Sequence, residues 1–343
     1  MSPRPMTVGR AVRGRIAALI ACASLVAACG SEPLDTDPVE FIIPSGATFA
    51  EVVDTLAQRG LVQRPTLFGW YARWKGFDTR VRAGTYVQTP GQPWSELLDD
   101  LAAGRVVTRP ITIPEGWALR QIGPRIADFT GALPDEVVSL LSDSTAHREY
   151  DVPGPGLEGY LLPETYRFAD GTTPETVIET MVDAYRAFWT PERTARLDTL
   201  GMTEAEVTTL ASIVQAEARI ADEMPRIAAV YHNRLDAGWP LQADPTVLYA
   251  LGGPRERLLY AAMDSVADSP YNTYTHPGLP PGPIGAPGAA ALEATLHPAD
   301  DPAMFFVVGE DGRHVFSRTL AEHNRAVAEY RRRQNRSSGG GLP

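Results

Sequence analysis

The chain has 343 residues, of which 44% are hydrophobic and 21% charged, which is typical of a globular protein with room for two domains. It carries 31 basic and 42 acidic residues, and its first 28 residues hold four arginines and no acid, so the rest has a net charge of about −15. An acidic body without a basic stripe argues against nucleic acid or an anionic lipid surface as the main partner.

Cysteine and histidine usage narrows the chemistry that the chain can perform. The two cysteines, Cys22 and Cys29, both belong to one apolar run near the N-terminus. We therefore expect no disulfide, no thiolate nucleophile and no cysteine-based zinc site in the body of the protein. The histidines show no HExxH or similar ligand spacing, so we predict no metal site. We assign to loops or packing the six histidines His147, His232, His276, His297, His314 and His323.

Residues 1–28 are predicted to be a lipoprotein-type signal peptide. Arg10, Arg13 and Arg15 precede an apolar run over 16–29, whose 14 residues fall short of the roughly 20 that a membrane-spanning helix needs. The run ends in Val-Ala-Ala-Cys, which resembles a bacterial lipobox, where Cys29 becomes the lipidated first residue. Residues 29–40 would be a tether, and the protein would face the periplasm or the outer side of the cytoplasmic membrane. The alternative is an uncleaved signal anchor.

Residues 41–107 are predicted to form a small βααβ unit followed by a further helix. The pattern indicates a strand over 41–43, a turn into a strand over 82–87, and helices over 50–58, 67–74 and 94–101. This order resembles the LysM-like module that accompanies certain cell-wall glycan enzymes. Some aromatic side chains could form a sugar-stacking platform, although their spacing is more typical of core packing. These side chains are Trp70, Tyr71, Trp74 and Tyr86.

A second region begins near residue 108 with a strand, a Pro-Glu-Gly turn and a helix. Residues 129–167 are expected to contain helix and loop and to end in LEGYLLPETYRF, a turn-rich aromatic segment that suits a cleft wall. A long amphipathic helix is predicted over 173–189, where its apolar face would serve for packing.

Residues 203–219 are predicted to form an amphipathic helix with one carboxylate on its apolar face. Leu210, Ile213 and Val214 lie within about 100° of arc on one side of this helix. Glu217 follows them by seven, four and three residues, so it falls in the middle of the apolar arc. The helix therefore directs Glu217 inward.

A capping box fixes where this helix begins and strengthens that assignment. Thr203 is followed three residues later by Glu206, the pairing that caps a helix N-terminus. An apolar wall raises the pKa of a carboxyl toward the range useful for a general acid. A structural glutamate bonded to a loop or an arginine would produce the same pattern, so the helix by itself leaves both interpretations open.

The remainder alternates helices with polar, proline-stiffened loops. A helix is expected over 225–235, with Asp222 as a candidate cap and Gly238 as its stop. The segments 241–246, 269–274 and 278–284 are predicted to be irregular loops, which either present a site or form a rigid surface meander. The last predicted elements are a helix over 289–296, a hairpin of strands 304–308 and 314–317, a helix over 320–333 and a disordered tail over 334–343.

Eight motifs, in this order, resemble the endolytic murein transglycosylases, the YceG-like or MltG family. They are LEGYLLPETY, LASIVQAEA, VYHNRL, LQADPTVLY, SPYNTY, GLPPGPIGAPG, LHPADDPAMFFVV and FSRTLAEHN, and the resemblance covers roughly residues 41–333. It implies an α+β protein with a LysM-like domain at 41–107 and a YceG-like catalytic domain at 108–333. It also implies cleavage of the MurNAc-GlcNAc bond within peptidoglycan strands, leaving 1,6-anhydro-MurNAc ends, with Glu217 as the catalytic residue and cell-wall synthases (penicillin-binding proteins) as partners.

One position departs from the family pattern. Members often carry an acid where this chain has Gln215, which lies about 160° from Glu217 around a helix. We expect Gln215 to face away from the site, so that the lost charge matters little. Glu217 then remains as the single candidate carboxylate of this helix.

The chemistry of this family suits a single carboxyl and requires no metal or cofactor. A glycoside hydrolase usually needs an acid and a second carboxylate, whereas a transglycosylase can use the sugar's own 6-hydroxyl as nucleophile. Glu217 would protonate the departing oxygen and then accept the proton of that hydroxyl. The candidate sugar contacts are Gln242, Asp244, Thr246, Tyr271, Asn272 and Tyr274, with Glu158 and Glu164 on the opposite wall.

Two other functions stay open at this stage. One is a lysozyme-like hydrolase, in which Asp244 or Glu164 would be the second carboxylate. The other is a non-catalytic scaffold that binds glycan and recruits wall synthases. The products of glycan digestion would separate the two enzymes, because a hydrolase leaves reducing MurNAc ends.

Overall fold

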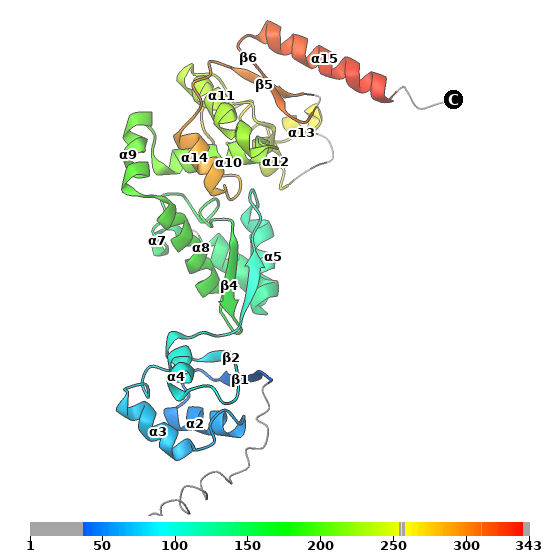
Figure 1. The fold of residues 1–343 in the computed structure, drawn as a ribbon. Helices are drawn as coiled ribbons and strands as arrows, with labels where there is room; N and C mark the ends of the chain where they lie inside the picture. The colour runs from blue at the N-terminus through cyan, green and yellow to red at the C-terminus, as the bar shows by residue number, and fades with distance from the viewer. Residues whose placement is uncertain (1–36, 144, 254, 256–257, 310, 339–343) are drawn as a thin grey trace, which may run out of the picture. The chain divides into compact units, whose positions relative to one another are not determined.

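The computed structural model describes residues 37–143, 145–253, 255, 258–309 and 311–338 (Figure 1). The predicted signal peptide and Cys29 lie outside these residues. The chain divides into two compact units, the first extending to Val107 and the second beginning at Thr108. That these units are a LysM-like and a YceG-like catalytic domain stays a prediction. No helix within the described residues is both long and apolar enough to cross a membrane.

The first unit is a two-stranded antiparallel sheet covered by helices. Its elements are β1 (Val39–Ile43), α2 (Phe49–Gln58), α3 (Pro65–Trp74), β2 (Gly84–Gln88) and α4 (Trp94–Ala103). In the sheet, Phe41 pairs with Tyr86, and their rings stack with centroids 5.6 Å apart. Gly84 adopts a φ of +141°, and a Cβ there would lie 2.4 Å from a methyl carbon of Val106, so only glycine fits at the start of β2.

The aromatic side chains of this unit divide into two groups, which corrects the expectation that their spacing indicates core packing. Tyr86 is fully buried, and Tyr71 is partly buried against the core. Trp70 and Trp74 are 74% and 77% exposed, because the face of α3 that enters the core is the one with Phe68 and Ala72.

The second unit mixes helices with two small antiparallel sheets, which confirms the predicted α+β class. Its first half consists of β3 (Thr108–Thr112), α5 (Leu119–Thr130), α6 (Pro134–Ser142), α7 (Ala146–Glu149), β4 (Thr165–Ala169), α8 (Pro174–Phe188) and α9 (Pro191–Leu200). Its second half consists of α10 (Glu204–Glu217), the 3-10 turn η1 (Ala221–Glu223), α11 (Met224–Asp236), α12 (Asp244–Ala250), α13 (Tyr260–Asp264), α14 (Ala289–Leu296), β5 (Phe305–Val308), β6 (His314–Ser317) and α15 (Leu320–Ser338).

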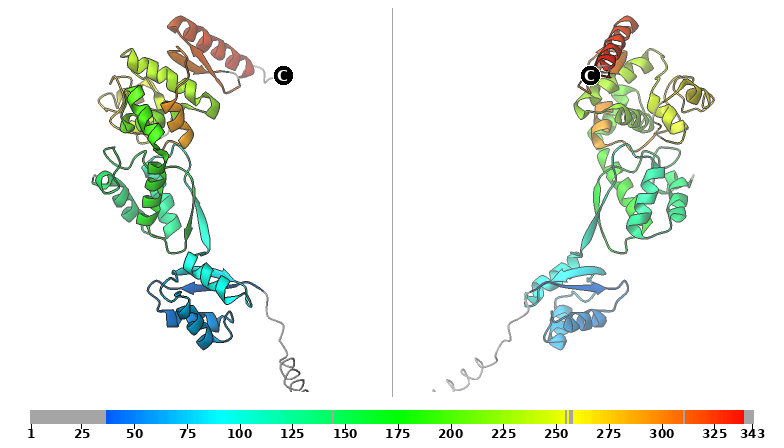
Figure 2. Two further views of the ribbon diagram at one scale, coloured as in Figure 1. Left: turned by 60° about the vertical axis from the view of Figure 1, so that its left-hand side comes forward. Right: turned by 90° about the vertical axis from the view of Figure 1, so that its right-hand side faces the viewer.

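The pair β3 and β4 joins segments that are distant in the sequence. Thr108 pairs with Ala169 and Thr112 with Thr165, so the strands run antiparallel across the whole length of both. Ile111, Tyr166 and Phe168 project from this pair into the hydrophobic core of the unit. Figure 2 shows the helices of this half of the unit on one side of the pair.

Helix α10 is the centre of the second half of the unit. It contacts α9, α11, α12 and α14, and Figure 1 shows it among these helices. Every residue from Val207 to Val214 is buried, including Thr208, Thr209 and Ser212. The predicted amphipathic helix is therefore wrong in one respect, since neighbouring helices cover its polar side as well as its apolar side. Its capping box is present, with Thr203 Oγ1 accepting from the Glu206 N–H and the Glu206 carboxylate accepting from the Thr203 N–H.

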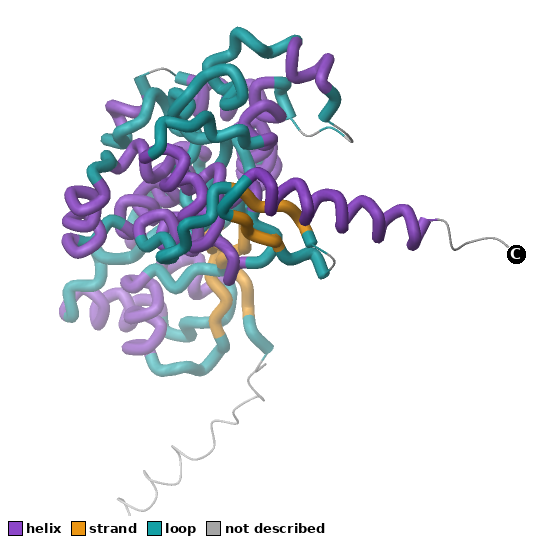
Figure 3. Tube along the Cα trace, turned by 90° about the horizontal axis from the view of Figure 1, so that it is seen from above, coloured by secondary structure: helices purple, strands orange, loops and turns teal. Residues whose placement is uncertain are grey.

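The C-terminal hairpin and the last helix form the outer part of this unit. β5 and β6 pair antiparallel from Phe305 and Ser317 to Val308 and His314, and α15 contacts both strands. Figure 3 shows the C-terminal part of α15 extending past the hairpin. The helix ends at Ser338, beyond the predicted end at residue 333, because Arg and Gln among these residues favour helix. The start of the predicted disordered tail is thus helical.

Two further expectations fail between α10 and α14. The segment 241–246, expected to be irregular, contains the start of α12, at Asp244 with Pro245 in its first turn. Proline is favoured at that position because its missing N–H has no partner in a helix. Asp222 does not cap α11. It lies in η1, and its carboxylate accepts from the guanidinium of Arg313.

Candidate active site

Glu217 is the last residue of α10, at the point where this buried helix reaches the surface of the core. The hydroxyl of Tyr231, from α11, donates to Glu217 Oε1 over 3.1 Å. Tyr231 is 1% exposed, and its ring meets Phe306 edge-on at 5.8 Å. Packing thus fixes the donor, and the donor fixes one oxygen of the carboxyl.

The surroundings of Glu217 favour its neutral form. Burial raises its pKa to about 7, and the negative charge of Asp244 acts in the same direction. The Tyr231 hydrogen bond and the positive charges of Arg234 and Arg219 lower the pKa, without cancelling the effect of burial. The position at a helix C-terminus also disfavours a negative charge, since the unpaired carbonyls there carry partial negative charge. A carboxyl with this pKa exists in both protonation states near neutral pH, as a group that first donates and then accepts a proton requires.

Glu217 opens into a cavity of about 370 Å³. Three predicted sugar contacts, Gln242, Asp244 and Tyr274, line the same cavity. The other lining residues come from α11, the hairpin and α15, and they are Tyr231, Arg234, Phe305, Phe306, Val307, Val308, His314, Leu320 and His323. Polar groups thus occupy one wall, and the strand β5 supplies a mainly apolar wall.

The loop before α12 directs its polar side chains into this cavity by alternation. Leu241 and Ala243 are fully buried, whereas Gln242 and Asp244 are exposed. Gln242 has a φ of 49°, in the left-handed region that non-glycine residues rarely adopt, and such backbone strain often occurs at functional sites. The Tyr274 hydroxyl donates to Asp244 Oδ1 over 2.6 Å, which orients the carboxylate.

Arg234 connects the polar wall to the hairpin. Its Nε donates to the carbonyl of Met304 over 2.8 Å, and its Nη1 donates to the carbonyl of Leu241. Its guanidinium lies 5.5 Å from the centroid of the Phe305 ring. One buried side chain on α11 therefore holds both the start of β5 and the loop that carries Gln242.

The hairpin is also attached to the turn that follows Glu217. Glu223, in η1, is buried, and its carboxylate accepts from the backbone N–H of His314 at 3.0 and 3.2 Å. His314 Nδ1 lies 2.9 Å from Glu223 Oε2. Arg313 adds a two-pronged contact to Asp222, at 3.1 and 2.8 Å. His314 was expected to be a loop or packing residue. It does pack, edge-on against Phe306 at 5.2 Å, and it also pairs with the buried Glu223 carboxylate and lines the cavity.

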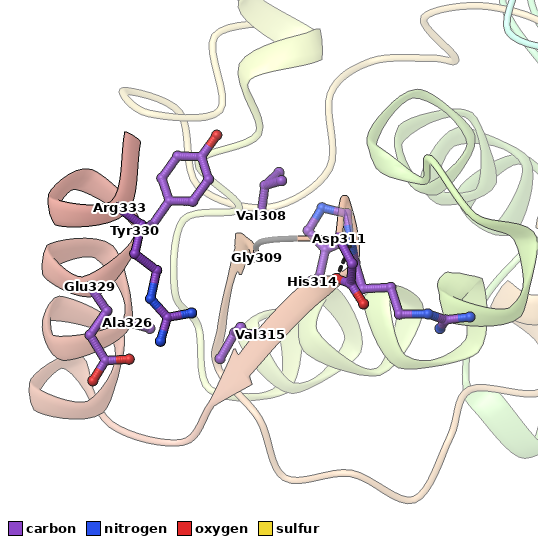
Figure 4. Close-up of a pocket in the computed structure, with 10 residues that line it drawn as sticks. Val308, Gly309, Asp311, His314, Val315, Ala326, Glu329, Tyr330 and Arg333 are labelled. Carbon is purple, nitrogen blue, oxygen red and sulfur yellow. Dashed lines mark hydrogen bonds between the residues drawn. The ribbon is translucent and has the colours of Figure 1, made fainter. Parts of the chain in front are cut away.

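A second cavity, of about 380 Å³, lies between the hairpin and α15 (Figure 4). Glu329, Tyr330 and Arg333 approach it from α15, facing Val308 and Val315 on the strands. The two cavities share Val308 and His314 as lining residues, so the end of β5 separates them.

Three predicted loop contacts do not line the Glu217 cavity. Thr246 is fully buried, and its hydroxyl donates to the carbonyl of Ala243 over 2.8 Å. Asn272 is also buried and donates to the carbonyls of Met263 and Val266. Tyr271 packs on the ring of Tyr249, with centroids 4.9 Å apart. These side chains stabilise the loops by contacts within them and with α12.

The two carboxylates expected on the opposite wall lie elsewhere too. Glu158 accepts from the Leu119 N–H at 3.1 Å and from the Tyr249 hydroxyl at 3.1 Å, and burial raises its pKa to about 7. It caps the N-terminus of α5, where Ala118 has no side-chain oxygen to do so. Glu164 is exposed, and its backbone carbonyl accepts from Ile113 beside the β3–β4 pair.

Gln215 faces away from the cavity and connects α10 to two other segments. Its amide Nε2 donates to Glu115 Oε2 over 3.1 Å, and its Oε1 accepts from the Gly288 N–H over 3.0 Å. A carboxylate in place of this amide would face the carboxylate of Glu115. An amide at this position therefore fits its surroundings better than a carboxylate would. Gln215 has a structural role, because it joins α10 to Glu115 and Gly288.

The residues that sequence reasoning missed are those that reach Glu217 from other elements. Tyr231 and Arg234 stand three residues apart on α11, so they share one face, and a phenol and a guanidinium on an otherwise apolar face were the available signal. His314 and His323 carried no recognisable pattern. His323 stacks on Phe305 at 5.3 Å, and burial lowers its pKa.

Comparison with known proteins identifies the family of the chain. The profile of the YceG-like family matches residues 41–329. The chain belongs to the YceG-like family. This family member is 33% identical over 318 residues to a Bacillus subtilis protein named endolytic murein transglycosylase, with 87% of each chain covered. It is 29% identical to a Streptococcus pneumoniae protein of the same name, over 87% of this chain and 60% of that protein.

A solved structure gives the same assignment. The crystal structure of a yceG-like protein from Listeria monocytogenes superimposes with a TM-score of 0.59 at 30% sequence identity. The superposition covers 84% of this YceG-like chain and 98% of the Listeria chain. In the part of our chain that the structure describes, no three His, Cys, Asp or Glu side chains are grouped as metal ligands would be.

Proposed function

We propose that this protein is an endolytic peptidoglycan transglycosylase that cleaves the MurNAc-GlcNAc bond within glycan strands. The observation that carries the proposal is Glu217, a carboxyl with a pKa raised to about 7 that opens into a cavity of about 370 Å³. The names of the Bacillus and Streptococcus relatives support the reaction class and the substrate. They also support a site of action in the cell envelope.

In the proposed reaction, Glu217 acts twice. Protonated Glu217 donates its proton to the bridging oxygen as the bond from that oxygen to the anomeric carbon of MurNAc breaks. The 6-hydroxyl of the same sugar then attacks the anomeric carbon, and its proton passes to the Glu217 carboxylate. The products are a free GlcNAc hydroxyl and a 1,6-anhydro-MurNAc end, and Glu217 is protonated again.

The other cavity residues would support this cycle. Tyr231 holds one oxygen of Glu217, so the second oxygen is the one placed to meet the glycosidic oxygen. The carboxylate of Asp244, oriented by Tyr274, supplies negative charge for the positive charge that develops at the anomeric carbon. The apolar side chains of β5 limit the access of water, which competes with the 6-hydroxyl.

The decisive experiment is mass spectrometry of products from uncrosslinked glycan strands, using the wild type and Glu217→Gln in parallel. We expect anhydro ends from the wild type and none from the variant. Glu179→Gln is a matched control, because Glu179 is an exposed glutamate of α8 outside the cavity. Full activity of Glu217→Gln would defeat the proposal and show that another group is catalytic, whereas a wild type without any activity would favour a scaffold role.

A hydrolase is the second candidate, because Asp244 lies in the same cavity as Glu217. Asp244 would then activate water, and the products would carry reducing MurNAc ends. Glu164, the other second carboxylate considered, does not line this cavity. The same mass spectra separate the two reactions, since reducing ends in place of anhydro ends would replace the transglycosylase assignment.

We also propose that the protein is a lipoprotein anchored through Cys29. The lipobox-like sequence Val-Ala-Ala-Cys supports the anchor. In cells fed a labelled fatty acid, Cys29→Ser should lose the label and leave the membrane fraction. A variant without label that still sediments with membranes would favour the uncleaved signal anchor.

Partnership with wall synthases is a further proposal, which crosslinking in intact cells would test.

A further inference from the structure

The exposed face of α3 in the first unit is apolar at its centre. Leu67, Trp70 and Trp74 are spaced by three and four residues, so they project from one side of this helix. Their exposed fractions are 55%, 74% and 77%. Single exposed apolar side chains are ordinary, but three large ones on one helix face indicate an interaction surface.

Positive charge is concentrated in the segment that contains α3, although the whole chain carries a net charge of −11. The segment 59–82 contains six basic residues and one acid, Asp78. All six cations are exposed, and they are Arg59, Arg64, Arg73, Lys75, Arg80 and Arg82. The absence of a basic stripe, argued from overall composition, is therefore wrong at this local scale.

The acids of the first unit are concentrated on other elements. Glu51 and Asp54 belong to α2, and Glu96, Asp99 and Asp100 belong to α4. Lys75 lies over the ring of Trp74, with its Nζ 5.0 Å from the centroid. Trp74 and Lys75 thus form one continuous surface at the C-terminal end of α3.

We propose that this face of α3, formed by Leu67, Trp70 and Trp74 and flanked by Arg64, Arg73 and Lys75, docks on an anionic phospholipid surface. Tryptophan prefers the boundary between headgroups and acyl chains, and each nearby cation adds attraction to anionic headgroups. The proposal also rests on the Cys29 anchor. Val39, where β1 begins, is ten residues beyond Cys29, so the start of β1 would lie within about 35 Å of the lipidated residue.

A glycan strand is the other class of partner that aromatic rings bind, and the observations favour it less. Sugars need flat rings together with hydrogen-bonding groups in a hollow surface. Leu67 offers no flat face, and the cavity of about 410 Å³ in this unit lies between the β1–α2 loop and α2, without any lining residue from α3.

Quenching by brominated lipid tests the docking directly. The full chain is reconstituted in vesicles of phosphatidylglycerol and phosphatidylethanolamine with brominated acyl chains, and tryptophan fluorescence is recorded. We expect quenching of the wild type and loss of most of it in Trp70→Phe/Trp74→Phe, since phenylalanine keeps the apolar surface but removes the reporters. Trp239→Phe is the control, because Trp239 is also exposed, at 45%, and lies in the second unit.

Charge variants test the second half of the proposal. Arg64→Gln/Lys75→Gln should weaken docking about fivefold for each cation removed. The proposal would be overturned if Trp70→Phe/Trp74→Phe were quenched as strongly as the wild type. It would also be overturned if the wild type were quenched equally in zwitterionic and anionic vesicles. A wild type that shows no lipid quenching, together with a Trp70→Ser/Trp74→Ser variant that no longer binds isolated glycan strands, would also overturn it in favour of glycan. The anchor is tested separately with neutral vesicles, because a lipid anchor does not depend on headgroup charge. A chain that does not sediment with them would contradict the Cys29 anchor alone, since quenching by anionic vesicles still reports on α3.

Discussion

Two carboxyls of the second unit, Glu217 and Glu158, have a pKa raised to about 7 by burial, yet their surroundings differ. Glu158 caps the N-terminus of α5 and accepts from both the Leu119 N–H and the Tyr249 hydroxyl. Glu217 ends α10 and lines an open cavity. Among the described residues, the Tyr231 hydroxyl is its one hydrogen-bond partner.

The comparison shows that a raised pKa by itself does not identify a catalytic acid. Both oxygens of Glu158 accept hydrogen bonds, from the Leu119 N–H and the Tyr249 hydroxyl, so its carboxyl serves to hold the start of α5. The single bond to Glu217 orients the carboxyl and leaves the other oxygen directed to the cavity. Glu217 differs from Glu158 in lining an open cavity and in having one carboxyl oxygen without a hydrogen-bond donor from the described residues.

The largest effect is expected from Glu217→Gln. The amide keeps the shape and can still accept from Tyr231, but it cannot transfer a proton, so activity should fall about a thousandfold or more. Glu158→Gln should change activity less than about tenfold. Rates of anhydro-end formation on isolated glycan strands measure both. A comparable loss in both variants would show that the two carboxyls are not functionally distinct.

A smaller effect is expected from Tyr231→Phe. The hydroxyl stabilises ionised Glu217, so its removal should raise the pKa of Glu217 above about 7. Because the acid must be protonated to act, the alkaline limb of the kcat profile should move to higher pH. We expect kcat at neutral pH to fall about tenfold through loss of positioning.

Tyr249→Phe is the matched control for this change, since Tyr249 makes the same kind of bond to Glu158. It should leave the pH profile of activity in place. An unshifted profile in Tyr231→Phe would mean that the bond to Glu217 is only structural.

The spacing was sufficient to predict that Glu217 points inward, because that information is local. A capping box sets the phase of α10, and the spacing from Leu210 to Glu217 sets the direction of the side chain. Their polarity in a proline-stiffened segment likewise singled out Gln242 and Asp244, which line the cavity. The sequence predicts a loop at the start of α12, although Asp244 and Pro245 are a usual helix start, because polar residues and proline are also typical of loops.

The rest of the site depends on contacts between distant segments. Glu223 and His314 are 91 residues apart, and no spacing rule relates them. Whether Glu158 faces a cavity or a helix N-terminus likewise depends on where α5 lies, and composition gives no indication of that. Periodicity also could not show that α10 is covered on its polar side, because burial there comes from neighbouring helices.

Glu158→Gln should also change how stability depends on pH. The pKa of Glu158 is about 7 in the folded protein, against an ordinary value of 4.5, so the folded state holds its proton more tightly than the unfolded state. The stabilisation is fully present below pH 4.5 and is lost as the pH rises through 7. Glutamine does not titrate, so we expect the variant's curve to be flatter by about 1 to 3 kcal/mol over this window. Urea denaturation at pH 5 and pH 8 measures it, and parallel curves for variant and wild type would contradict it.

The smallest effect is expected from Tyr249→Phe. The variant loses the 3.1 Å bond to Glu158 but keeps its ring against Tyr271 and under Arg120, so the free energy of unfolding should fall by about 1 kcal/mol. The lost bond favoured ionised Glu158, so the pKa of Glu158 rises and stability falls off at higher pH than in the wild type. Activity should stay within about twofold, because this hydroxyl acts on the carboxyl that caps α5. A loss of activity as large as that in Tyr231→Phe would place Glu158 in the reaction and remove the distinction between the two carboxyls.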